Sequence, residues 1–341
     1  MIKRFITSAK ITLILVYLVI IAGAAVRMTG SGMGCPDWPK CFGYYIPPSD
    51  IKELTWAPHR DFEKGQVIIK DETLLVANDD FTTGESFDAS HWRPYTKHDY
   101  AIFNPKHTWI EYINRLVGAL AGIATFAMAI LSLRFWRKDR KLTWLSWLAV
   151  FMMGFQGWLG AKVVYSVLNP IKITLHMVVA LLIVALVLYI IRKAQGTLVR
   201  KKHDNLFRNV LMIALALSLI QIMVGTQVRQ FVDEQVKLLG DSQMGLVLKN
   251  PDFAFYFHRS FSMFVLMLNV VLFARNKNLH LGFDKMNWVL AFIIIEIFTG
   301  VGMYLFEFPF GSQAAHLVIA SLLFGVQFYL LLEANEGKKS S

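Results

Sequence analysis

The sequence contains two similar stretches, FQGWLGAKVVYSVLNPIKITLHMVVALL at residues 155–182 and IEIFTGVGMYLFEFPFGSQAAHLVIASL at residues 295–322. A shift of 140 residues aligns Gly160 with Gly300 and His176 with His316. In both copies an apolar run ends, a short connection follows, and the histidine opens a second apolar run. We therefore expect each copy to join two helices, and the pair to mark an internal repeat.

Weaker matches extend this repeat in the same order. EYINRLVGAL lies on FYFHRSFSMF, which aligns Asn114 with His258 and Arg115 with Arg259. GAAVRMTG lies on GTQVRQFV, which aligns Gly23 with Gly225 and Arg27 with Arg229. The repeat predicts two four-helix halves, residues 1–195 and 196–341, related by an axis along the membrane normal.

Composition sets the class of protein. Of the 341 residues, 55% are hydrophobic and 17% are charged, with mean hydropathy +0.45, whereas soluble domains carry about 25% charged residues. Eight apolar runs are each long enough to cross about 30 Å of hydrocarbon, and a β-barrel would show short alternating segments instead. We predict an all-α integral membrane protein with helices near residues 11–28, 109–133, 142–164, 172–192, 208–229, 253–274, 286–306 and 313–333.

Charge alternates between successive connections. The N-terminus, RFWRKDRK, RKAQGTLVRKKHDNLFR, ARNKNLHLGFDK and EGKKSS are basic, while acids offset bases in the others. The positive-inside rule places both termini in the cytoplasm, so we expect a multi-pass protein of the cell inner membrane. The net charge of +11 then reflects anionic lipid headgroups as partner rather than nucleic acid. The connection 29–108, with strand-like pieces QVIIK and TLLVA, is expected to form a small outer cap.

Two histidines of the second half, His258 and His316, begin predicted helices that enter from the same outer side. Two imidazoles facing each other across a four-helix bundle are suited to bind haem iron. Nearby glycines would let a flat cofactor approach, and Arg229 and Arg259 would supply countercharge for propionates. The alternative for either histidine alone is a hydrogen-bonded packing residue. The recurrence of histidines at matched sites favours haem, with the iron-binding sites toward the outer side.

The first half departs from this symmetry because Asn114 stands where the second half has His258. A haem there would be held by His176 alone, which leaves an open position suited to a reaction. Glu111 is either a functional carboxylate within the membrane or an i,i+4 ion-pair partner of Arg115. His107, on a similar helix face, is an alternative ligand.

The two cysteines, Cys35 and Cys41, lie in GSGMGCPDWPKCFG directly after the first apolar run. On the oxidising side of a membrane this spacing indicates a loop disulfide. The disulfide is either structural or redox-active, because short exposed disulfides can be labile.

Several of these segments resemble the haem A synthase family. They are VRMTGSGMGCPDWPKCFG after the first helix, EYINR on the second, QGWLGAKVV on the third, and histidines at the starts of the fourth, sixth and eighth. Members usually carry Glu-x-x-His-Arg on the second helix. Here Glu111 and Arg115 match, but Asn114 replaces the histidine. The resemblance does not extend to the 45–105 insertion.

This resemblance implies a membrane oxidoreductase that oxidises a ring methyl of haem O to the formyl group of haem A for terminal oxidases. It implies haem b on His258 and His316, and haem O as substrate at His176, with Glu111 orienting the macrocycle or moving protons. Arg27 and Arg115 would meet the substrate propionates. The alternatives are a dihaem cytochrome that relays electrons without modifying haem, and a transporter. An electron acceptor is required but not identified. Docking to haem O synthase or cytochrome oxidase assembly proteins, and homo-oligomerisation, are left open.

Overall fold

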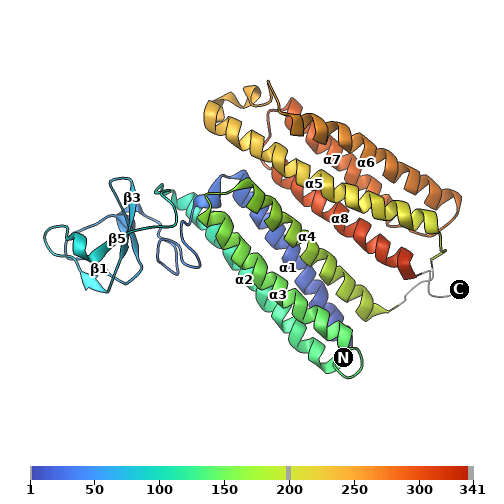
Figure 1. Ribbon diagram of the computed structural model, residues 1–341, viewed down its shortest axis with the longest axis horizontal. Helices are drawn as coiled ribbons and strands as arrows, with labels where there is room; N and C mark the ends of the chain where they lie inside the picture. The colour runs from blue at the N-terminus through green and yellow to red at the C-terminus, as the bar shows by residue number, and fades with distance from the viewer. Residues whose placement is uncertain (1, 197–200, 337–341) are drawn as a thin grey trace.

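The computed structural model describes residues 2–196 and 201–336. Within them, eight helices are long and apolar enough to cross a membrane, which confirms the predicted fold class. Figure 1 shows them as two bundles lying side by side, with a small β-rich segment projecting from the end of the first. The helices are α1 Ile2–Met28, α2 Pro105–Ser132, α3 Arg140–Tyr165, α4 Pro170–Gln195, α5 Asn205–Leu239, α6 Phe253–Asn278, α7 Met286–Leu305 and α8 Ser312–Glu336.

Local sequence explains where several helices begin. Asn104 accepts hydrogen bonds from the backbone amides of Lys106 and His107, and Pro105 follows at the first helical position. Asn169 and Pro170 repeat this arrangement at α4. Capping satisfies amides that have no partner within the helix, and proline there loses no hydrogen bond.

Two predicted helix bounds were wrong. Helix α1 begins at Ile2 rather than near residue 11, and α5 continues to Leu239 rather than ending near residue 229. The apolar runs mark where a helix crosses hydrocarbon, whereas the backbone stays helical into the polar ends. Of the predicted basic connections, Arg200, Lys338 and Lys339 lie outside the described residues.

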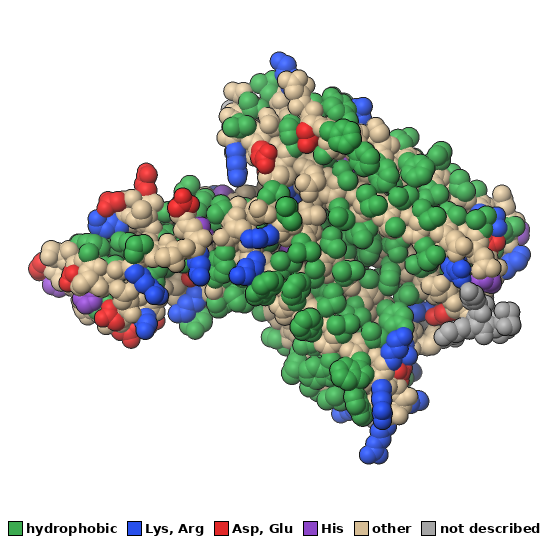
Figure 2. Space-filling model, viewed as in Figure 1, with side chains coloured by type: hydrophobic (Ala, Val, Ile, Leu, Met, Phe, Trp, Pro, Cys, Tyr) green, Lys and Arg blue, Asp and Glu red, His purple; other side chains and the backbone are tan. Residues whose placement is uncertain are grey.

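Each bundle has its own apolar core. In the first, Phe5, Val16 and Ile183 are among the buried members, and in the second Phe207, Leu211 and Met286 are. A third cluster, which includes Leu181, Ile222 and Phe324, joins the bundles through α4, α5 and α8. On the face drawn in Figure 2, exposed hydrophobic side chains cover much of the surface of the helices. Lipid is the solvent that such a surface requires.

The connection between α1 and α2 contains two small antiparallel sheets. Strands β2 Val67–Lys70, β3 Thr73–Ala77 and β5 Trp92–Pro94 form one, in the order β2-β3-β5. Its register pairs Ile68 with Leu75 and Ala77 with Trp92. Strands β1 Asp61–Phe62 and β4 Phe81–Thr82 form the other. The predicted strand-like pieces QVIIK and TLLVA thus contain strands β2 and β3, which pair with each other.

Candidate functional site

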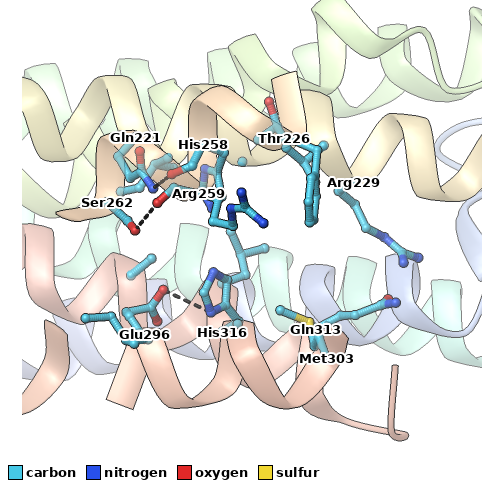
Figure 3. A pocket seen from close by; sticks show the side chains of 18 of the residues that line it. Gln221, Thr226, Arg229, His258, Arg259, Ser262, Glu296, Met303, Gln313 and His316 are labelled. Atoms are coloured by element: carbon cyan, nitrogen blue, oxygen red, sulfur yellow. Dashed lines mark hydrogen bonds and ion pairs between the residues drawn. The ribbon is translucent and has the colours of Figure 1, made fainter. Parts of the chain in front are cut away.

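A cavity of about 420 Å³ lies within the second bundle, and His258 and His316 are both in its lining. Figure 3 shows the two rings facing this space from α6 and α8. Their ring centroids are 6.3 Å apart. Metal–imidazole bonds are about 2.0–2.1 Å, and about 1.1 Å separates each nitrogen from its ring centre, so two rings on one metal would be about 6.3 Å apart. The spacing therefore fits a single haem iron between them.

Each of the four polar positions named by the repeat lies against a glycine of the preceding helix. A Cβ atom added to Gly225 would lie 3.1 Å from Cε1 of His258, and one added to Gly160 would lie 3.3 Å from Cε1 of His176. Gly300 stands in the same relation to His316, and Gly23 to Asn114, at 3.6 and 4.0 Å. The odd-numbered helices thus supply the space that the rings of the even-numbered helices fill.

We predict that Gly225→Ala lowers haem retention by about tenfold, the scale of mutations that disturb ligand orientation. The added methyl displaces the His258 ring from its position beside the cavity. Gly300→Ala is the matched control, because its methyl would make an ordinary contact with His316. Both changes favour the helix equally, so the difference reports ring position. Haem content per purified chain measures it, and equal retention by the two variants would contradict the prediction.

Two arginines from different bundles lie at this cavity. Arg229 pairs with Asp233 at 2.7 Å, and Arg27 pairs with the same carboxylate at 3.4 Å. Both line the cavity, as does Arg259, whose guanidinium also lies 5.6 Å from the Tyr256 ring. The sequence assigned Arg27 to the first half, whereas its side chain lies beside the second-half cavity. Two guanidiniums sharing one carboxylate leave excess positive charge, which suits an anionic group.

Glu111 and Arg115 hold the cysteine-containing loop. One carboxylate oxygen of Glu111 accepts the backbone amide of Cys35 at 2.8 Å, and the other accepts from Arg115 at 2.5 Å. The i,i+4 ion pair is therefore present. Arg115 also donates to the carbonyls of Asp37, Lys40 and Cys35, at 2.7, 2.9 and 3.0 Å. The side chain of Glu111 is 5% exposed and that of Arg115 is 13% exposed, and their contacts fix this loop on α2.

The loop itself is closed by the predicted disulfide between Cys35 and Cys41. Inside it, the Asp37 carboxylate accepts backbone amides from Phe42 and Gly43, at 2.5 and 2.7 Å. Burial raises the pKa of Asp37, and these two amides and the Arg115 charge act in the opposite direction. His98 contacts the Pro36 carbonyl of the same loop at 2.8 Å.

We predict that Arg115→Met lowers the free energy of unfolding by about 3–5 kcal/mol, because it leaves the buried Glu111 without its cation. Three loop carbonyls lose a donor as well. Arg93→Met is the control, since Arg93 is an exposed residue of β5, and it should change stability by about 0.5 kcal/mol or less. Denaturant unfolding in detergent measures both, and similar stability of the two variants would refute the assignment.

The remaining sequence candidates are placed as follows. His176 is on α4. Among the described residues, neither its Nδ1 atom nor that of His258 has a hydrogen-bond partner. Thr174, two residues before His176, contacts Thr226 of α5 at 2.7 Å and so links the bundles at this level. His107 precedes Asn114 by seven residues, about 10 Å along the helix, which separates the two candidate ligands in depth.

Sequence reasoning missed Gln156, Gln221 and Glu296. Each lies four residues before a glycine that contacts a histidine ring, and each is hydrogen-bonded or ion-paired to that histidine residue. The repeat alignment could have identified two of them, because the shift of 140 residues aligns Gln156 with Glu296.

These features define a class: a polytopic helical membrane protein with two related bundles, one of which holds a histidine pair spaced for a haem. A family model described as cytochrome oxidase assembly protein matches residues 7–328. The chain belongs to that family.

Individual relatives agree with this assignment. The chain is 23% identical to the "Heme A synthase" of Flavobacterium johnsoniae over 93% of this chain and 94% of the relative. It is also 23% identical to that of Alkalihalophilus pseudofirmus over 97% of each. The match to the Shewanella oneidensis protein of the same name, at 26% identity, covers 63% of this chain and 54% of the relative.

Proposed function

We propose that this protein is a haem A synthase, which oxidises a ring methyl of haem O to the formyl group of haem A. The observation that carries the proposal is the inequality of the two bundles. His258 and His316 are spaced to hold one iron from both faces, whereas the matched pair in the first bundle is Asn114 and His176. A site with one strong ligand leaves room for a reaction, and a site with two suits electron transfer.

Bound haem b would supply one-electron redox chemistry in the second bundle, and haem O is the substrate of the first. His258 and His316 would hold the cofactor iron, and the Arg27–Asp233–Arg229 cluster with Arg259 would offer countercharge for its propionates. His176 binds the substrate iron. Arg115 was expected at the substrate propionates, and its hydrogen bonds to the loop add a second role: it holds the loop carbonyls over α2.

Glu111 is the proposed acid–base group of the first bundle. Its Oε atoms are held by the Cys35 amide and by Arg115, so the carboxylate has a fixed position next to the disulfide loop. A carboxylate in a low-dielectric site can accept and return a proton as the substrate methyl is oxidised. Its exposed fraction of 4% limits exchange of that proton with water.

In the proposed topology the protein lies in the inner membrane of the cell, and both of its termini are in the cytoplasm. Helix α1 begins and α8 ends at the end of the bundles remote from the sheets (Figure 1). Arg134, Lys193 and Arg275 are among the basic residues at that end, as the positive-inside rule requires. The histidines and the disulfide then lie toward the outer side.

Haem extraction tests the function. We expect that expressing the chain in cells that make haem O yields haem A, or haem O hydroxylated at the methyl, in the membrane extract. Cells carrying the empty vector are the control. Extracts that contain only unmodified haem O and haem b, with normal amounts of folded protein, would favour a dihaem cytochrome and overturn the proposal.

A further inference from the structure

Helices α3, α5 and α7 each direct one polar side chain to the neighbouring histidine. The three residues are Gln156, Gln221 and Glu296, and each lies four residues before the glycine that contacts the ring. Two of them act alike. The amide of Gln156 donates to the backbone carbonyl of His176, and that of Gln221 to the carbonyl of His258, both at 2.9 Å. These contacts join helices and leave the imidazole nitrogens untouched.

Glu296 departs from this pattern. Its Oε2 lies 3.1 Å from Nδ1 of His316, so it contacts the imidazole itself (Figure 3). The hydroxyl of Thr299 lies 2.8 Å from the same nitrogen. Thr299 is also 2.9 and 3.0 Å from the carbonyls of Ile295 and Glu296. Its hydrogen is used there, so its oxygen accepts from His316.

Thr299 is therefore an acceptor at Nδ1, and an ionised Glu296 offers only acceptor oxygens. A neutral imidazole with its proton on Nδ1 has a free lone pair on Nε2, and Nε2 is then the atom available to an iron. Metal-binding histidines commonly have a carboxylate, carbonyl or water at their other ring nitrogen, which raises the basicity of the ligand. At His316 the hydrogen bond is to Thr299, and Glu296 lies beside it.

The carboxyl group of Glu296 has few polar neighbours. Its side chain is 15% exposed, and its Oε1 has no hydrogen-bond partner in the described part of the chain. Among residues 2–196 and 201–336, no Lys or Arg lies within 4 Å of this carboxyl group. A haem bound between His258 and His316 would bring a positive charge close to this carboxyl group through His316.

The geometry points to Glu296 as a positioning residue that lowers the reduction potential of the haem held by His258 and His316. A negatively charged carboxylate beside Nδ1 of the ligand would stabilise the ferric iron more than the ferrous iron, which carries one positive charge less. Within the part of the chain that the structure describes, His176 has no such partner, because Gln156 occupies the matched position. The two haem sites thus differ in both ligand number and ligand basicity. This inference rests on the proposed haem site in the second bundle.

The test is a spectroelectrochemical titration of purified Glu296→Gln. The change removes the charge, keeps the size, and installs the residue that the repeat already carries at positions 156 and 221. We expect the reduction equilibrium to shift about tenfold toward ferrous haem, a rise of about 59 mV for a one-electron couple. The low-spin spectrum should be retained.

Thr299→Val is the matched control, since it removes the neutral acceptor on the same nitrogen and leaves the charge. Its potential should shift less than that of Glu296→Gln. An unchanged potential in Glu296→Gln, or a larger shift in Thr299→Val, would overturn the inference while leaving the haem site intact. If Glu296→Gln retains too little haem, Glu296→Asp is measured instead, because the shorter side chain keeps the carboxyl group but moves it away from His316. An unchanged potential in that variant would equally overturn the inference. Absence of a low-spin haem from the unmodified protein would instead refute the proposed function.

Discussion

Replacing His316 by alanine should abolish the low-spin haem b spectrum of the purified protein. Haem content should fall by at least about tenfold, because mutating a residue that merely supports a metal ligand already lowers metal affinity by about that factor. The reason is geometric. The ring centroids of His258 and His316 are 6.3 Å apart, and at this spacing both rings would bind one iron. With one ring removed, only His258 would remain to bind the iron, and the low-spin signature of the pair would be lost.

The control for this prediction is His59→Ala. His59 is an exposed residue of the outer segment whose ring contacts Glu85, far in sequence from either bundle core. It should keep the full spectrum. An unaltered low-spin spectrum in His316→Ala, with the protein folded, would exclude His316 as a ligand and with it the assignment of the second bundle.

Replacing Glu111 by glutamine should make haem O accumulate, with haem A output reduced by about 10²–10⁴-fold, the usual contribution of a positioned acid–base group. Glutamine keeps an oxygen that can accept the Cys35 amide, so the loop retains a contact with α2. It removes the charge and the ability to take up a proton. Haem analysis of membranes, normalised to folded protein and to the low-spin haem of the second bundle, gives the measurement.

Glu234→Gln is the control, because Glu234 is an exposed carboxylate on α5 that bonds Gln230. It should leave haem A output unchanged. The glutamine and alanine variants of Glu111 separate chemistry from loop support. If Glu111→Gln makes haem A normally while Glu111→Ala fails, the residue only holds the loop and the proposed proton role is wrong.

Much of the fold follows from hydrophobicity and repetition alone. Long apolar runs locate the helices because lipid requires backbone hydrogen bonds to be satisfied within each segment. The alignment of His176 with His316, and of Asn114 with His258, named positions that the structure places against Gly160, Gly300, Gly23 and Gly225. Helix ends were less certain, because α1 and α5 stay helical beyond their apolar runs.

Other features were not readable from the sequence. Arg27 lies on the first helix, yet its side chain joins Asp233 and Arg229 beside the cavity of the second bundle. Arg115 and Arg259 are equivalent in the repeat, but Arg115 is engaged by loop carbonyls and Arg259 lines the cavity. The repeat assigns residues to equivalent backbone positions, and the different connections around them decide which partners they meet.

The sequence by itself determined the membrane class, the two related halves, the disulfide and the histidine positions, because each depends on residue type and spacing along one chain. Only the tertiary structure decided the partners. The ring spacing of His258 and His316, the grip of Glu111 and Arg115 on the cysteine loop, and the contact of Glu296 with His316 all join separate helices. Such contacts are set by how helices pack and by the rotamers that packing permits, and linear spacing does not encode them.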